Sequence, residues 1–491
     1  MFYIGIDLGT SSVKLLLMDG TGRIEKIVSR EYPISFPRPG WSEQNPQDWW
    51  RETKKGIQEL TAECDRSQVA GISFGGQMHG LVILDKDDKV IRPAILWNDG
   101  RTQKETDYLN EVIGKERLSA YTANIAFAGF TAPKLLWIKK NEPASFERIA
   151  KIMLPKDYIA YCLTGVHSSD YSDASGMLLL DVKKRCWSKE MMEICGIREE
   201  QLPKLYESFE VTGTLKGEIA GELGLPKTCK AAAGAGDNAA AAIGTGTVGN
   251  GKCNISLGTS GTIFISSAQF CVDPSNALHA FAHADGKYHL MGCMLSAASC
   301  NKWWMDEILK RSDYEQEQKR IERLGENQVF FLPYLMGERS PHNNPYARGT
   351  FTGLSMDSTR EDMTQAVLEG VGFAIRDSLE VARTQGIRIE RSTICGGGAK
   401  SALWKRMIAN ILDVKLDVIR SEEGPALGGA MLAAVACKEY GSVEEAAEAI
   451  VQVADTIEPE QELVEKYEKK YQVFAAVYPA LKPVFEKMAE R

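Results

Sequence analysis

The stretch of sequence that decides the fold occurs twice. Residues 6–13 read IDLGTSSV and residues 255–262 read ISLGTSGT, so the tetrapeptide LGTS begins at Leu8 and again at Leu257, about half a chain later. Each copy lies between two runs rich in β-forming residues, which predicts a strand, a tight turn containing glycine and a returning strand. A repeat at half the chain length predicts two similar domains.

Both halves continue in the same order after the repeat. An apolar run ends in glycines at 69–76 in the first half and at 392–398 in the second, and each half also has a glycine followed by an alanine-rich segment, at 236–242 and at 424–434. Strands that alternate with helices predict an α/β fold. We expect two α/β domains, residues 1–248 and 249–491, which present their glycine turns to a shared deep cleft. The predicted strands are Phe2–Leu8, Val13–Met18, Asn254–Leu257 and Thr262–Ser267.

The two alanine-rich segments carry signals for a helix start. Asp237 or Asn238 suits the N-cap of the first helix, and Pro425 suits the first turn of the second. The Lys/Glu-rich segment 458–470 near the C-terminus is expected to form solvated helix faces.

Composition excludes several classes of protein. The chain has 491 residues, of which 44% are hydrophobic and 25% charged, and its net charge is −8, which argues against nucleic acid or an anionic membrane as the main partner. No run of about 18 apolar residues predicts a membrane span, and the first residues lack the basic segment of a signal peptide. Eleven cysteines without paired spacing indicate free thiols in a reducing compartment. We therefore expect a cytoplasmic protein.

The twin glycine turns suit phosphate. A Gly-Thr-Ser turn exposes backbone N–H groups and hydroxyls without a bulky side chain, and two such turns could hold two parts of one polyphosphate. The alternative for either turn alone is an ordinary hairpin. The chain has no P-loop motif. Residues 234–239 and 244–249 fit the loose dinucleotide pattern, but no acidic residue follows between Asn238 and Val272 to hold a ribose, which disfavours a dehydrogenase.

Two aspartates are candidates for the chemistry of phosphoryl transfer. Asp7 ends the first predicted strand, and its counterpart in the repeat is Ser256, so a role needed only once, such as binding Mg²⁺, is indicated. Its alternative role is to stabilise the turn. Asp237, between glycines and alanines that leave room for a ligand, is the candidate base for an acceptor hydroxyl. Its alternative role is helix capping alone.

Polar segments of the first half are candidates for the acceptor pocket. Residues 75–80 and 96–101 bring amides, the His79 imidazole and the Trp97 indole, which suit a polyhydroxyl compound. A lone histidine is also commonly structural, and the other histidines show no zinc spacing.

Taken together, these motifs resemble the FGGY carbohydrate kinases of the actin-like ATPase superfamily. Residues 129–137 are similar to the first signature of that family and residues 349–370 to its second, and the resemblance runs from Tyr3 to about Cys437. It implies two ribonuclease-H-like domains with a deep inter-domain cleft, ATP mostly on the C-terminal domain and sugar mostly on the N-terminal one.

The resemblance also implies roles for single residues. Asp237 would accept the proton of the sugar hydroxyl, and Asp7 and Asp237 would hold Mg²⁺. The residues implied in sugar binding are Met78, His79, Trp97, Asp99, Asp237 and Asn238. The residues implied in binding ATP are Thr10, Ser11, Ser12, Lys14, Gly258, Thr259, Gly397 and Gly398.

The expected reaction is ATP-dependent phosphorylation of the 5-hydroxyl of D-xylulose, with MgATP and a small sugar as the partners. Kinases of L-ribulose, L-xylulose, gluconate or glycerol are alternatives, because only the acceptor pocket would differ. A non-catalytic actin-like ATPase is a further alternative, although it would need no acceptor base. A homodimer is compatible with the sequence.

Overall fold

In the computed structural model, which describes residues 1–421 and 423–490, both copies of the repeat form an antiparallel hairpin. Strands β1 (Phe2–Leu8) and β2 (Ser12–Asp19) make the first, and β16 (Lys252–Leu257) and β17 (Gly261–Ser267) make the second. Both predicted hairpins are therefore confirmed.

The chain divides into two compact units, which are each discontinuous in sequence. Unit 1 comprises Met1–Gly249, Ala280–His289 and Glu423–Val451, and unit 2 comprises Asn250–His279, Leu290–Glu422 and Gln452–Arg491. The simpler division into residues 1–248 and 249–491 stays a prediction.

The strands of the two large sheets are those named above and β3 (Ile24–Glu31), β5 (Val69–Gly76), β13 (Val211–Thr214), β14 (Lys230–Ala232), β15 (Ala235–Gly236), β18 (His279–Ala282), β19 (Tyr288–Met294), β22 (Arg391–Cys395), β23 (Lys415–Ile419) and β24 (Val453–Ile457). Strands in small two-stranded sheets are β4 (Glu43–Gln44), β6 (Val82–Leu84), β7 (Ala94–Ile95), β8 (Lys151–Met153), β9 (Ser168–Asp170), β10 (Leu180–Asp181), β11 (Cys186–Trp187), β12 (Lys204–Tyr206), β20 (Phe330–Leu332) and β21 (Thr350–Thr352).

The helices of unit 1 are α1 (Pro46–Leu60), α2 (Gln103–Asp107), α3 (Lys115–Thr122), α4 (Thr131–Asn141), α5 (Pro143–Glu147), α6 (Pro155–Thr164), α7 (Tyr171–Ala174), α8 (Lys189–Cys195), α9 (Gly217–Leu223), α10 (Asp237–Gly244), α15 (Gly424–Ala436) and α16 (Val443–Ile450). The helices of unit 2 are α11 (Ala298–Trp303), α12 (Tyr314–Gln318), α13 (Arg360–Thr384), α14 (Ala402–Leu412) and α17 (Gln461–Ala489). Short 3₁₀ or π segments are η1 (Arg66–Gln68), η2 (Tyr108–Gly114), η3 (Ser175–Met177), η4 (Glu199–Gln201), η5 (Trp304–Ile308) and η6 (Gly397–Lys400).

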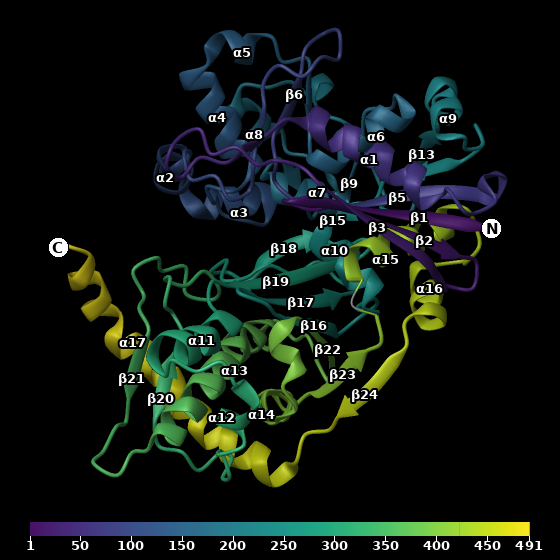
Figure 1. Ribbon diagram of the computed structural model, residues 1–491. Helices are drawn as coiled ribbons and strands as arrows, with labels where there is room; N and C mark the ends of the chain where they lie inside the picture. The colour runs from purple at the N-terminus through teal and green to yellow at the C-terminus, as the bar shows by residue number, and fades with distance from the viewer. Residues whose placement is uncertain (422, 491) are drawn as a thin grey trace. The chain divides into compact units, whose positions relative to one another are not determined.

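The two large sheets repeat one topology. The first has the order β13-β14-β5-β1-β2-β3, with β15 paired to β5, and the second, read from its far edge, has the order β24-β23-β22-β16-β17-β19-β18. In both, the edge pair is antiparallel, the next two pairings are parallel and the repeat hairpin is antiparallel. Figure 1 shows β1, β2 and β3 side by side in the first sheet and β16, β22 and β23 in the second. The shared pattern supports the duplication that the sequence predicts.

The core of unit 1 lies against its sheet. Strand β1 is buried on both faces, as a parallel-paired strand of an α/β sheet usually is, and its apolar side chains belong to the main core cluster. Helix α15 is buried all round and packs on β1 and β5, and Pro425 stands in its first turn as predicted. A Cβ on Gly5 would lie 1.8 Å from the carbonyl oxygen of Ala426, so glycine in β1 allows helix and sheet to touch.

The expectation of solvated helix faces in the C-terminal segment 458–470 holds for most of its charged side chains and fails at Lys470. Helix α17 does expose many charged side chains, but Lys470 is buried, and its ammonium lies 2.6 Å from a carboxylate oxygen of Glu369. The buried carboxylate on α13 provides a partner that sequence composition does not reveal. Across the described residues, none of the helices is both long and apolar enough to cross a membrane.

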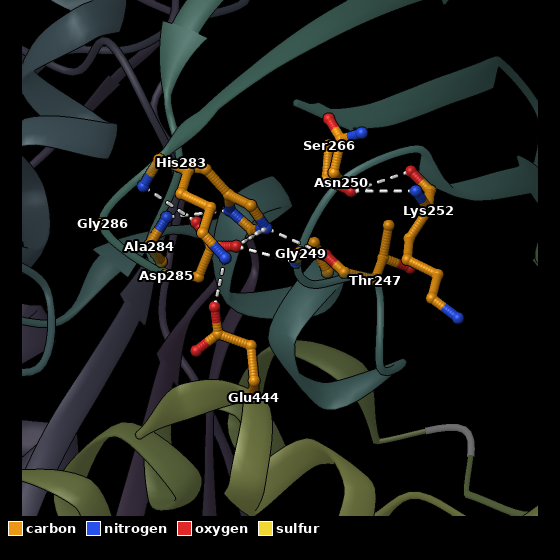
Figure 2. A network of polar contacts seen from close by, with 12 residues as sticks. Thr247, Gly249, Asn250, Lys252, Ser266, His283, Ala284, Asp285, Gly286 and Glu444 are labelled. Atoms are coloured by element: carbon orange, nitrogen blue, oxygen red, sulfur yellow. Dashed lines mark hydrogen bonds and ion pairs between the residues drawn. The ribbon is translucent and has the colours of Figure 1, made fainter. Parts of the chain in front are cut away.

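The end of α10 is tied to the loop between β18 and β19 within unit 1. The ring Nε2–H of His283 donates a hydrogen bond of 2.9 Å to the carbonyl oxygen of Thr247, and the amide of Gly249 donates one of 2.9 Å to Asp285 (Figure 2). Since α10 begins at Asp237, these bonds fix the far end of the helix that carries the candidate base.

Candidate functional site

Asp7 lies in the middle of the first sheet. Its register partners are Lys14 on β2 and Gly75 on β5. The Lys14 ammonium forms an ion pair of 2.8 Å with Glu423, at the start of α15. Burial, followed by the nearby carboxylate of Asp237, raises the pKa of Asp7 to about 7, while Lys14 opposes the shift. The two predicted metal ligands are thus close enough to sense each other's charge.

The turn between β1 and β2 is held from several sides. The amide of Gly9 donates to the carbonyl oxygen of Ser12 over 3.0 Å, which closes the turn. The Thr10 hydroxyl oxygen accepts a 3.0 Å bond from the Trp97 indole, and the Thr10 carbonyl accepts one of 2.6 Å from Gln44. Thr10, Ser11 and Ser12, predicted to bind phosphate, therefore sit on one fixed turn.

Asp237 is the first residue of α10, directly after β15. Its Oδ1 accepts hydrogen bonds from the backbone amide of Asn238 (2.7 Å) and from the side-chain amide of the same residue (2.9 Å). Burial raises the pKa of Asp237 to about 6, and the two bonds from Asn238 limit the rise. The carboxylate is therefore more basic than an ordinary aspartate and still largely ionised at pH 7.

The expectation that Asp237 or Asn238 caps α10 is wrong. The N-cap residue is Gly236, and no side chain caps the helix. Gly236 still belongs to β15, so the chain passes from strand to helix without a linker, and the carboxylate that could have capped the helix bonds to its neighbour instead.

Met78 and His79 follow β5, Met78 lies against Gly236 and Asn238, and both Met78 and His79 border Gly176. The Met78 sulfur is 4.0 Å from the Asn238 side-chain amide, and a Cβ on Gly236 would lie 3.0 Å from Met78 Cγ. The structure therefore brings to one place in unit 1 the predicted residues Met78, His79, Asp237 and Asn238.

His79 is fixed in an unusual backbone conformation. Its φ of 69° lies in the left-handed region, which is uncommon for a residue other than glycine. Its ring stacks on Phe130 with 4.6 Å between the ring centroids, and Nδ1 lies 2.7 Å from the carbonyl oxygen of Gly176. Since a carbonyl only accepts, Nδ1 carries the proton, and in the neutral form of the ring the acceptor nitrogen is Nε2.

Trp97 and Asp99 differ in their surroundings. The Trp97 side chain is 48% exposed and lies next to Thr10. Asp99 is buried, and its carboxylate accepts bonds from the backbone of Ser42 and from the backbone and guanidinium of Arg101. Contact of Asp99 with a sugar stays a prediction, but the bonds that it makes are those of a residue that stabilises its own loop.

Unit 2 contains a pocket of about 900 Å³. Four residues predicted to bind ATP line it, namely Gly258, Thr259, Gly397 and Gly398. A Cβ on Gly398 would lie 2.9 Å from the ring of Trp404, whose indole donates to the carbonyl oxygen of Leu368 over 2.9 Å. The absence of a side chain at Gly398 thus lets the indole form part of the wall.

Sequence reasoning missed other residues of this pocket. Ser299 donates a 2.7 Å bond to the carbonyl oxygen of Thr259 and so holds the second glycine turn against α11. Gln318 accepts a 2.5 Å bond from Ser401, which joins α12 to the start of α14. No motif marks these residues, because they come from segments that meet only in the folded unit.

The donor set near Asp7 suits Mg²⁺. This ion prefers oxygen ligands and commonly uses one or two protein carboxylates together with phosphate oxygens and water. Asp7 and Asp237 provide two carboxylates whose pKa values are raised mainly by burial, so a cation beside them would favour their ionised forms. Within the described part of the chain, no group of three or more His, Cys, Asp or Glu side chains forms a metal site, so a cage built by the protein alone is not present there.

Comparisons with known proteins place this arrangement in a family. The N-terminal domain model of the FGGY family of carbohydrate kinases matches residues 2–244, and the C-terminal domain model of the same family matches residues 253–437. The chain therefore belongs to the FGGY family of carbohydrate kinases, and the predicted two-domain α/β fold of that family is confirmed.

Relatives extend the match over nearly the whole chain. Xylulose kinase of Escherichia coli (strain K12) is 40% identical over 98% of this chain and 99% of its own length. A solved structure described as a xyloylose kinase from Brucella ovis has a TM-score of 0.93 and 42% identity, and the match covers 99% of this chain and 100% of that one. Gluconate kinase from Lactobacillus acidophilus has a TM-score of 0.93 at 27% identity, with 99% of both chains covered.

Proposed function

We propose that this chain transfers the γ-phosphoryl group of ATP to the 5-hydroxyl of D-xylulose in xylose catabolism in the cytoplasm. The observation that carries the proposal is the position of Asp237, a carboxylate of raised pKa next to Asn238 and Met78. The names of the relatives that are 40% and 42% identical support xylulose as the sugar.

In the proposed mechanism, unit 1 binds and orients the sugar. Asp237 accepts the hydrogen bond of the 5-hydroxyl and directs its oxygen towards the γ-phosphorus, and it takes the proton as the new P–O bond forms. Nε2 of His79 accepts a hydrogen bond from another sugar hydroxyl, because the bond to Gly176 fixes the proton on Nδ1. Such positioning accounts for a large part of the rate of a phosphoryl transfer, because the transition state is loose.

Unit 2 binds the nucleotide. Its pocket of about 900 Å³ lies within the range of small-molecule sites, and the Gly258–Thr259 turn borders it. We propose that the nucleoside lies over Gly397 and Gly398 and that the phosphates lie along the Gly258–Thr259 turn. Asp7 and Asp237 would hold Mg²⁺, which when bound neutralises charge on the phosphate oxygens.

A panel of sugars tests the proposal. ADP release with ATP and saturating Mg²⁺ is measured for D-xylulose, L-xylulose, L-ribulose, gluconate and glycerol, and the product is identified by mass spectrometry. D-xylulose should give the highest kcat/KM and a pentulose phosphate. The matched control is Asp237→Asn, which keeps the size of the side chain and should lower kcat by about 100-fold or more while ATP still binds.

Two outcomes would contradict the proposal. A higher kcat/KM with gluconate would favour the activity named for the neighbour from Lactobacillus acidophilus, whose fold is similar over the whole chain. ADP release without any phosphorylated sugar, unchanged in the Asp237→Asn variant, would favour a non-catalytic actin-like ATPase.

A further inference from the structure

A buried ionic cluster lies next to the segments that carry the base and the sugar-binding residues. Lys156, Asp157, Asp170 and Asp173 are each at most 1% exposed. The Lys156 ammonium lies 2.6 Å from Asp157, 2.9 Å from Asp170 and 3.8 Å from Asp173. Three carboxylates thus share one ammonium, and such burial of charge is rarely a net gain in stability. The cluster therefore invites a role other than stabilising the fold.

A chain of hydrogen bonds leads from this cluster to the residue before the base. Oδ2 of Asp170 accepts bonds from the backbone amide (2.8 Å) and the hydroxyl (2.5 Å) of Ser172. The Ser172 hydroxyl oxygen in turn accepts a 3.2 Å bond from the backbone amide of Gly236. Since Gly236 is the N-cap of α10 and Asp237 follows it directly, the cluster holds the peptide from which the base projects.

A second connection runs through the methylene groups of Lys156. A Cβ on Gly76, at the end of β5, would lie 2.7 Å from Lys156 Cβ, and Gly76 is the register partner of Gly236. Gly76 also leads directly to Met78 and His79 in the chain. One lysine side chain therefore supports the strand ends that precede both the base and the sugar-binding residues.

Asp173 distinguishes the cluster from an ordinary ion pair. Neither of its carboxylate oxygens has a hydrogen-bond partner, although both are buried. Burial raises the pKa of Asp173 well above its usual range, against the attraction of the Lys156 ammonium. Asp170 is the member of the cluster that accepts hydrogen bonds from both the backbone amide and the hydroxyl of Ser172.

We propose that Lys156 and Asp170 are positioning residues for phosphoryl transfer, and that they fix the direction of the Asp237 carboxylate through Ser172 and the amide of Gly236. The inference rests on the proposed role of Asp237 as the base. It assigns a function to Lys156, which lies in the first turn of α6 and is remote in the chain from α10.

A matched pair of serine variants tests the proposal. Ser172 and Ser208 are both buried, and both hydroxyls donate to Oδ2 of Asp170, over 2.5 and 2.8 Å. Only the Ser172 hydroxyl accepts from Gly236. Ser172→Ala should lower kcat for sugar phosphorylation by about 10- to 100-fold, with the KM for ATP within twofold, because small misplacements of a reacting group have effects of this size. Ser208→Ala should keep kcat within about twofold of the parent value. Its change in melting temperature should be similar to that of Ser172→Ala.

The comparison remains decisive if one variant folds poorly. Ser172→Cys keeps a weak acceptor at the same place, so its kcat should fall between those of the parent and Ser172→Ala. It replaces Ser172→Ala in the comparison if the alanine variant does not fold. An equal loss of kcat in the Ser172 and Ser208 variants, or a Ser172→Ala enzyme within twofold of the parent, would overturn the inference. If Asp237→Asn kept its turnover, the proposed function would fail instead, whatever the serine variants do.

Discussion

At the scale of single residues, the proposed chemistry depends on two carboxylates, Asp7 and Asp237, whose pKa values burial raises. The pKa of Asp7 is raised to about 7 and that of Asp237 to about 6, in both cases mainly by burial. A cation bound between them would be attracted by both, and its binding would release the protons that they hold near neutral pH. The dependence of activity on Mg²⁺ should therefore change with pH.

The variant Asp7→Asn should reveal this coupling. At pH 8 the parent Asp7 is mostly ionised, so removing its charge should raise the Mg²⁺ concentration for half-maximal activity by about tenfold. At pH 6 only about a tenth of the parent Asp7 is ionised, so the two enzymes should nearly converge. The measurement is the ratio of the Mg²⁺ concentration for half-maximal activity in the variant to that in the parent, taken at pH 6 and at pH 8 with fixed ATP. Comparing the two enzymes at the same pH removes the effect of ATP protonation, which is the same for both. A ratio that does not change with pH would remove Asp7 from the metal site.

At the scale of elements, the close approach of α10 and α15 fixes the helix that begins with the candidate base, Asp237. A Cβ on Gly428 in α15 would lie 1.9 Å from the carbonyl oxygen of Ala240, and one on Gly244 would lie 2.1 Å from that of Gly424. Helices can touch at this distance only where glycines face the partner backbone. The alanine-rich sequence of α15 predicted a helix, but not that its partner helix comes from the other half of the sequence.

Gly428→Ala should therefore destabilise unit 1. Because the added methyl meets backbone and no flexible side chain, the free energy of unfolding should fall by about 1–3 kcal/mol or more, and kcat should fall as α10 shifts. Gly221→Ala is the control, since Gly221 is an exposed residue of α9 with no atom within 4 Å of its Cβ position. The free energy of unfolding of Gly221→Ala should rise by up to about 1 kcal/mol, because alanine has a higher helix propensity than glycine. Thermal and urea unfolding of both variants provide the comparison, and an equally stable Gly428→Ala enzyme would contradict the packing argument.

At the scale of the whole molecule, the residues proposed for the two ligands lie in different units. The candidate base and sugar residues belong to unit 1, whereas the 900 Å³ pocket is formed by unit 2 alone. Nucleotide binding and sugar binding should therefore be separable by mutation.

Gly397→Val tests this separation. A Cβ at Gly397 would meet no atom within 4 Å, so the larger side chain fits the fold and takes up space in the pocket that Gly397 lines. Isothermal titration calorimetry should show at least about tenfold weaker binding of a non-hydrolysable ATP analogue, with sugar binding in the absence of nucleotide unchanged. Gly397→Ala should have a smaller effect. The assignment of the pocket to the nucleotide would be refuted if the variant bound the ATP analogue and the sugar equally more weakly. It would also be refuted if the variant bound both ligands as tightly as the parent.

The sequence by itself determined the repeat, the two hairpins and the residue types of the chemistry. These features are local: alternating apolar runs, a glycine turn and an aspartate before a helix can be recognised without knowing what packs against them. The same reasoning failed at the cap of α10, because the strand β15 runs directly into the helix and leaves Gly236 at the capping position.

Only the tertiary structure decided which residues support the site. Lys156, Asp170 and Ser172 are joined to Gly236 by contacts between segments up to 80 residues apart, and Gln318 and Trp404 meet Gly398 in one pocket wall. It also decided that Lys470 is buried and that α15 belongs with the first sheet. The physical reason is that burial and charge pairing depend on neighbours in space, and local sequence patterns carry no record of which distant segment will supply them.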